Sequence, residues 1–114
     1  MRFALTVLAS ERSWRLPQAE VDKIVAEHVK LVAELKSRGR FINVYRLRPG
    51  REAKTIRVKD GRRVIEDGPL TSTDEAVGAF YLIECESHEE AMAWADKLAI
   101  FDWESIEVRR LWTD

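Results

Sequence analysis

Residues 77–98 read VGAFYLIECESHEEAMAWADKL, and this stretch is the clearest guide to the fold. Its first ten residues, Val77 to Glu86, are rich in aromatic and branched side chains and predict a strong central β-strand. Ser87 and Glu90 then have the spacing of a capping box, in which two side chains satisfy backbone N–H groups at the start of a helix. The apolar face of that helix consists of Ala91, Trp94, Ala95 and Leu98. A strand therefore leads directly into an amphipathic helix.

Residues 1–47 predict a second unit of the same kind. Arg2 to Ala9 is nearly continuous in apolar character, as expected of a buried strand. Pro17 suits the first residue of a helix, and Gly39 stands where a glycine commonly ends one. The apolar stripe of this helix consists of Val21, Ile24, Val25, His28, Leu31, Val32 and Leu35. Phe41 to Leu47 then predicts another strand, so this part of the chain reads strand, helix, strand.

The middle of the chain predicts a β-hairpin. Residues 55–59 and 62–66 are short runs with β-branched residues, joined by Asp60-Gly61, and Asp-Gly suits a type I′ turn because both central residues need positive φ. A final strand is expected at about residues 105–111. With no repeat or linker in the sequence, residues 1–114 are expected to form a single domain. The order of elements predicts an α+β fold, a ferredoxin-like sandwich with an inserted β-hairpin.

The composition of the chain argues against nucleic acid and membrane as partners. The 114 residues are 46% apolar and 34% charged, with a net charge of −1, so no basic surface for nucleic acid is evident. A lone cysteine, Cys85, fits a reducing compartment. The apolar N-terminal run is broken at Ser10-Glu11-Arg12, so it is too short for a membrane span, and it lacks the small-residue cleavage site of a signal peptide. We expect a cytoplasmic protein that binds neither nucleic acid nor membrane.

The predicted sheet has more apolar surface than two helices can cover. Apolar strand residues fall on both faces: Phe3, Leu5, Val7, Phe80, Tyr81, Leu82 and Ile83. The uncovered face must be buried elsewhere, and a second copy of the same face is the economical solution. We therefore expect a homodimer.

A basic stretch covers the end of the second strand and the hairpin. Its members are Arg46, Arg48, Arg51, Lys54, Arg57, Lys59, Arg62 and Arg63. Such charges could attract an anionic ligand or partner. More often they keep a projecting hairpin edge from aggregating, and this is the interpretation we favour.

Asp67-Gly68-Pro69-Leu70, leading through Gly78 to Ile83, resembles the signature of the YCII-related family, in the branch named after its Asp-Gly-Pro-Phe (DGPF) motif. The resemblance extends over nearly the whole chain and implies a dimeric α+β barrel, with a cleft between sheet and helices that could hold a small molecule. Some members are proposed to be small enzymes that use a histidine and an aspartate, and one relative is a dehydrochlorinase of chlorinated hydroxyquinols. Other members accompany extracytoplasmic-function sigma factors.

By position, the resemblance assigns catalytic roles to His28 and Asp67. His28 lies within the apolar stripe of the first helix, where burial would keep the imidazole neutral and able to accept a proton. Asp67 could orient it. Each residue also has a structural interpretation: His28 as a core histidine bonded to a backbone carbonyl, and Asp67 as the cap of its own turn.

The chain departs from the family pattern after the motif. Leu70 replaces the phenylalanine, Ser72 and Asp74 stand where the family usually has glutamate and lysine, and Glu75 is kept. The sequence thus supports two functions, a cofactor-independent lyase or isomerase with a His28–Asp67 pair, or a non-catalytic ligand-binding or sigma-factor-associated accessory module. No metal is expected, because the two histidines and Cys85 lack metal-ligand spacing, and no cofactor fingerprint is present.

Overall fold

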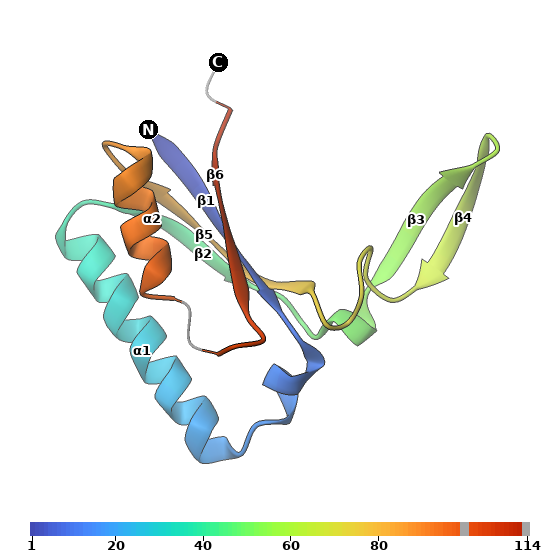
Figure 1. Ribbon diagram of the computed structural model, residues 1–114, viewed down its shortest axis with the longest axis horizontal. Helices are drawn as coiled ribbons and strands as arrows, with labels where there is room; N and C mark the ends of the chain where they lie inside the picture. Colours follow the sequence, from blue (N-terminus) through green and yellow to red (C-terminus); the bar gives the residue numbers. More distant parts are fainter. Residues whose placement is uncertain (99–100, 113–114) are drawn as a thin grey trace.

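Four strands form one antiparallel sheet in the structure, a computed structural model that describes residues 1–98 and 101–112. The strands are β1 (Arg2–Ala9), β2 (Phe41–Arg46), β5 (Ala76–Glu84) and β6 (Ser105–Arg110). Their order is β2-β5-β1-β6, so β1 and β5 lie in the centre. The sheet is open, with β2 and β6 at its edges (Figure 1). The α+β class predicted from the sequence is confirmed.

Two helices connect strands that are not neighbours in the sheet. α1 (Gln18–Ser37) joins β1 to β2, and α2 (His88–Asp96) joins β5 to β6 (Figure 1). Ser87 caps α2 as predicted, because its Oγ accepts the backbone N–H of Glu90 at 3.1 Å. Within the described residues, neither helix is long and apolar enough to cross a membrane.

Gly39 ends α1 and redirects the chain into β2. Its φ is 68°, in the left-handed region that glycine adopts without strain. The N–H of Arg40 donates to the carbonyl of Leu35 at 2.8 Å, and that of Gly39 donates to Lys36 at 3.1 Å. These two bonds form a Schellman motif and satisfy carbonyls at the helix end.

One face of the sheet and both helices enclose the hydrophobic core. Alternate residues of β1 and β5 point into it, and α1 and α2 add their apolar faces from the same side. Leu35 is only 1% exposed, and burial of such a side chain contributes about 1.5–3 kcal/mol. The core consists of Phe3, Leu5, Val7, Leu31, Leu35, Ala79, Tyr81, Ile83, Cys85, Ala91, Trp94, Ala95 and Leu98. The predicted apolar face of α2 is buried in full.

The opposite face of the sheet carries no helix among the described residues. Its apolar groups include Phe80 and Tyr45, whose ring centroids are 5.2 Å apart, and Tyr45 remains 47% exposed. The apolar character of β1 and β5 on both faces therefore reflects one covered and one uncovered face, not two covered ones.

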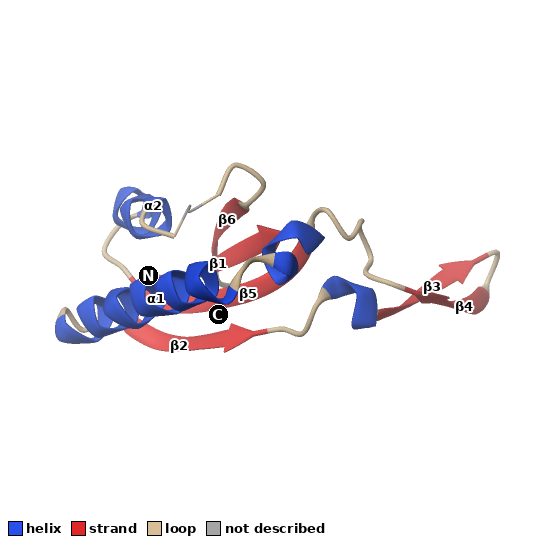
Figure 2. Cartoon of the chain, turned by 90° about the horizontal axis from the view of Figure 1, so that it is seen from below, coloured by secondary structure: helices blue, strands red, loops and turns tan. Residues whose placement is uncertain are grey.

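β3 (Lys54–Lys59) and β4 (Arg62–Asp67) form a separate hairpin. Asp60 and Gly61 have φ values of 52° and 77°, which confirms the predicted type I′ turn. The hairpin projects away from the sheet and helices in both views (Figures 1 and 2). One of its faces exposes Ile56, Val58 and Ile65.

Candidate functional site

A cavity of about 620 Å³ lies between α1 and the sheet, and its helical lining extends from Val21 to Lys36. A short 3₁₀ helix, Glu11–Arg15, borders it at one end. The sheet residues in its wall include Ala9, Gly78 and Ala79, which are too small to reach the helix. Leu31 and Leu35, in the second half of α1, are buried, whereas the first half has no buried residue. α1 therefore packs on the core through Leu31 and Leu35, while other side chains between Val21 and Lys36 border the cleft.

His28 lies in the wall of this cleft, on the sheet-facing side of α1. Its Nδ1 is hydrogen-bonded to the phenol of Tyr81, and the two ring centroids are 6.0 Å apart. Tyr81 comes from the central strand β5 and is itself almost completely buried. The structural interpretation of His28, a core histidine bonded to a backbone carbonyl, does not describe this arrangement. The partner is a side chain that also lines the cleft.

Burial keeps both groups of this pair uncharged. Desolvation lowers the pKa of His28 below its ordinary value of 6.5, and the nearby Arg46 guanidinium lowers it further. Burial raises the pKa of Tyr81 to about 12, although the charge of Arg46 opposes this shift. At neutral pH the cleft thus contains a neutral imidazole and a neutral phenol. Such a pair can accept one proton and donate another.

Glu104 lies in the wall of the same cleft. It accepts a hydrogen bond from Ser13 Oγ at 3.4 Å, and Ser13 Oγ in turn accepts the indole N–H of Trp103 at 2.9 Å. Desolvation raises the pKa of the Glu104 carboxyl. The protein therefore supplies an acidic group in the cleft that holds its proton more strongly than an exposed glutamate.

Asp67 lies elsewhere in the single chain, at the end of β4 in the projecting hairpin. Its side chain is 88% exposed, and its carboxylate accepts the ammonium of Lys54 at 2.7 Å. That ion pair lowers the pKa of Asp67. A role for Asp67 at His28 stays a prediction. In the described chain, Tyr81 is the hydrogen-bond partner of the imidazole.

Cys85, Leu70 and Asp74 do not line this cleft in the described part of the chain. Cys85 is buried in the core, and burial raises its pKa to about 11, so the thiol is inert. Leu70 is exposed, and Asp74 accepts a 3.4 Å hydrogen bond from Ser10. No cluster of side chains suited to a metal occurs in residues 1–98 and 101–112.

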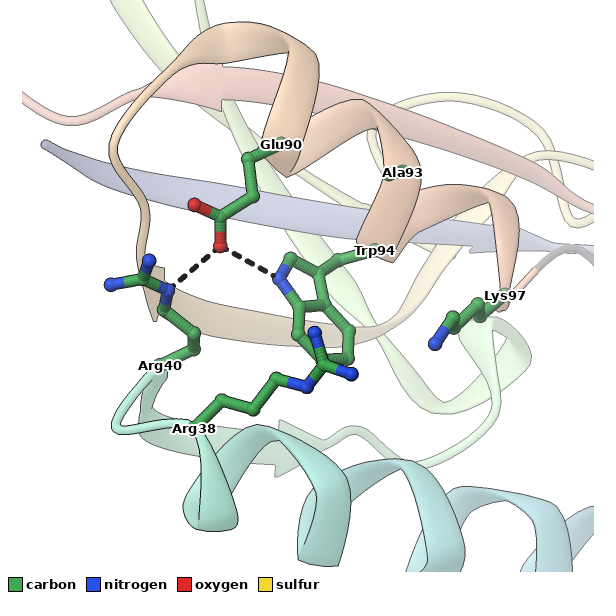
Figure 3. Close-up of a pocket in the computed structure, with 6 residues that line it drawn as sticks. All are labelled: Arg38, Arg40, Glu90, Ala93, Trp94 and Lys97. Atoms are coloured by element: carbon green, nitrogen blue, oxygen red, sulfur yellow. Dashed lines mark hydrogen bonds and ion pairs between the residues drawn. The ribbon is translucent and has the colours of Figure 1, made fainter.

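A second, smaller pocket of about 330 Å³ lies between α2 and the end of α1 (Figure 3). Glu90 lies between Arg40 and Trp94, accepting the guanidinium at 2.8 Å and the indole N–H at 3.1 Å. Lys97 lies 4.8 Å from the centroid of the Trp94 ring and pairs with Glu34 at 2.7 Å. Because most of its cations are already neutralised, we interpret this pocket as a structural junction between the two helices.

Sequence reasoning missed Tyr81 and Arg46 as members of the site. A tyrosine within a buried strand needs a partner for its hydroxyl, and His28 was the one polar residue in the apolar stripe of the first helix. The need of the Tyr81 hydroxyl for a buried polar partner could have identified His28 as that partner. The basic stretch of the sequence places Arg46 together with the hairpin charges, although Arg46 lies on β2 and lines the cleft. The pairing of β2 with β5, which sets the face on which Arg46 lies, separates it from the other arginines of the stretch.

Comparison with known proteins gives the chain a family. The YCII-related domain matches residues 1–113. An uncharacterised protein of Rhizobium meliloti (strain 1021) is 39% identical over 61 residues. That match covers 54% of this chain and 49% of the relative, so it extends over about half of each protein.

Proposed function

The chain belongs to the YCII-related family, and we propose that the cleft beneath α1 is an active site. The proposed activity is that of a cofactor-independent lyase or isomerase acting on a small organic molecule. One observation carries it, the hydrogen bond between His28 and Tyr81 in the wall of a largely apolar cavity. Concave apolar sites with a few convergent polar groups are where ligands usually bind.

His28 acts in this proposal through one of its two neutral tautomers. With the proton on Nδ1, the imidazole donates to the Tyr81 oxygen and its Nε2 lone pair remains free to accept a proton. The phenolic O–H of Tyr81 is then free to donate to a substrate oxygen. One residue serves as the general base and the other as the hydrogen-bond donor.

The proposed step is proton abstraction next to a carbonyl group. Nε2 of His28 takes the proton, the C–H electron pair forms a C=C bond, and the carbonyl π electrons move onto oxygen. Tyr81 donates a hydrogen bond to that enolate oxygen. In an isomerisation the imidazolium returns the proton to another carbon. In an elimination the enolate electrons expel a leaving anion, which departs with its bonding pair while the proton is released from His28.

A general base at this position is expected to contribute roughly 10²- to 10⁴-fold in rate. The test measures exchange of carbon-bound hydrogen in D₂O by NMR, over a panel of small phenols and enolisable ketones. His28→Gln should abolish the exchange that the wild-type protein catalyses. His88→Gln is the matched control, because it removes the other histidine, which is exposed. Equal rates for wild type and His28→Gln would exclude this function.

We also propose that the chain is a ferredoxin-like protomer and that two copies form a dimeric α+β barrel. The strand order β2-β5-β1-β6, with two helices on one face, supports the first statement. The uncovered face, with Tyr45 and Phe80 at its surface, supports the second. Pairing this face with its copy is the self-complementary arrangement of a two-fold dimer.

A non-catalytic accessory module is the second candidate. The hairpin supports it, since β3 and β4 expose Ile56, Val58 and Ile65 on one face, and exposed apolar groups of this kind suit a protein partner. The departures at Leu70, Ser72 and Asp74 from the family pattern agree with a changed role. Retention of full cellular function by His28→Gln, together with its loss in Ile65→Ser, would favour this candidate over the enzyme.

A further inference from the structure

We propose that the ligand of the cleft is a small organic carboxylate, and that Arg46 holds its carboxylate group. The inference rests on the proposed function only because it concerns the same cleft, the one that contains His28 and Tyr81. It adds the chemical class of the ligand and the residue that selects it. Three observations carry it: the position of Arg46 in the sheet, and, among the described residues, its lack of an acidic partner and the absence of a competing anion beside it.

The register of β2 against β5 directs Arg46 into the site. Val44 is opposite Tyr81 and Arg46 is opposite Ala79. Because strand side chains alternate between faces, Val44 and Arg46 share one face, and Val44 packs on the core beneath the helices. Arg46 therefore lies on the helix side of the sheet, two residues along β2 from Val44, the residue opposite Tyr81. Its charge reaches both catalytic candidates, as its effects on the pKa values of His28 and Tyr81 indicate.

Among the described residues, Arg46 differs from the arginines near it in having no acidic partner. Arg48 pairs with Glu52 at 2.9 Å, and Arg51 pairs with Glu11 at 2.8 Å. Within residues 1–98 and 101–112, no ion pair or side-chain hydrogen bond joins the Arg46 guanidinium to another residue. A cation at the edge of an apolar cavity, without a protein counter-ion, suits an anionic ligand. Arginine is also the cation whose planar donors match a carboxylate in two parallel hydrogen bonds.

The cleft contains no competing anion near Arg46 in the described chain. Among the described residues of its wall, Glu104 is the one with a carboxyl group; it bonds with Ser13, and desolvation raises its pKa. Lys36 adds a second cation, held 5.1 Å from the centroid of the Phe41 ring. The charges of the cleft therefore favour a ligand with a negative charge at the β2 side. Its apolar part can occupy the remaining cavity, against Trp14, Val21 and Ile24.

The experiment uses benzoate and its neutral analogue benzamide, with binding followed by amide chemical shifts in ¹⁵N-labelled full-length protein. Wild type should bind benzoate about tenfold to a hundredfold more tightly than benzamide, which is the range expected of a charge-assisted hydrogen-bonded contact. Arg46→Gln should reduce benzoate binding to the level of benzamide. Arg46→Lys should keep part of the preference, because it retains the charge and loses the planar fork.

Arg63→Gln is the matched control, since it removes the same charge from the exposed hairpin and should leave the preference intact. Equal binding of both compounds to wild type, no binding of either, or an unchanged preference in Arg46→Gln would each overturn the inference. Benzoate shifts that spare the residues of the cleft would do so as well. Because this readout needs no turnover, an inactive protein that still prefers benzoate would refute the enzyme and keep the carboxylate site.

Discussion

His28 on α1 and Tyr81 on β5 are joined by a hydrogen bond, although 53 residues separate them in the chain. The bond crosses the cleft between helix and sheet, and burial keeps both partners neutral. The bond places a neutral imidazole, which can accept a proton, beside a neutral phenol, which can donate one. The predictions below test this pair, its electrostatic surroundings and the surfaces around it.

Tyr81→Phe should separate the chemical role of the phenol from its packing. Phenylalanine keeps the ring in the core but removes the hydroxyl, which leaves His28 Nδ1 without its partner. We expect the free energy of unfolding to fall by about 0.5–1.5 kcal/mol, the net value of one hydrogen bond. Any catalysed hydrogen exchange should fall by about tenfold or more. Denaturant unfolding and the exchange assay measure the two effects, and unchanged exchange would restrict Tyr81 to a structural role.

The stability of the protein should depend on pH through His28. Its pKa in the folded state is lowered from 6.5, so the unfolded chain binds more protons as the pH falls below that value. The free energy of unfolding should therefore decrease as the pH falls from about 6.5 towards the folded-state pKa. The difference between wild type and His28→Gln, measured by denaturant unfolding at several pH values, isolates this contribution. A constant difference across that range would contradict the shift.

Arg46→Gln should raise the pKa of His28. The guanidinium disfavours the imidazolium, so its removal makes protonation of His28 easier, while burial still keeps the pKa below that of a free histidine. NMR titration of the imidazole C–H signals measures the midpoint, and His28→Gln assigns the signal. A midpoint that stays the same would show that Arg46 lies too far from the ring to act on it.

Asp67→Asn discriminates between the two partners considered for His28. In the single chain the substitution removes the ion pair with Lys54 and should leave the His28 titration unchanged. Stability should change little, because the pair is exposed to solvent. A downward shift of the His28 midpoint would instead show that the carboxylate reaches the imidazole, which a hairpin donated by a second copy would explain.

Tyr45→Glu tests the proposed dimer. A carboxylate on the uncovered sheet face, beside Phe80, would be buried without a partner when two copies pair. We expect sedimentation to show a dimer for wild type and a monomer for the variant. Met92→Glu is the control, since Met92 is exposed on α2, which covers the opposite face of the sheet. A monomeric wild type would refute the dimer directly.

The local elements were largely predictable because their signals lie within a few residues. Asp60-Gly61 specifies its turn through positive φ, Ser87 caps α2, and Gly39 ends α1. The ends of the elements were harder to predict, because they depend on partners elsewhere in the chain. β5 ends at Glu84 and not at Glu86, because its ladder with β1 ends at the pair Arg2 and Glu84, and the next backbone bond, from Cys85, goes to Met1.

By itself, the sequence determined the α+β class, the hairpin, the apolar faces of the helices and the inward position of His28, since each depends on short-range periodicity or turn chemistry. The partner of His28 was decided by tertiary structure alone. Whether Tyr81 or Asp67 lies beside the imidazole depends on how α1 crosses β5 and on where the hairpin projects. The cleft has the same origin: small residues such as Gly78 and Ala79 leave space under α1 only because the fold places them there. Side-chain pairing across distant segments, which no local pattern encodes, therefore created the site.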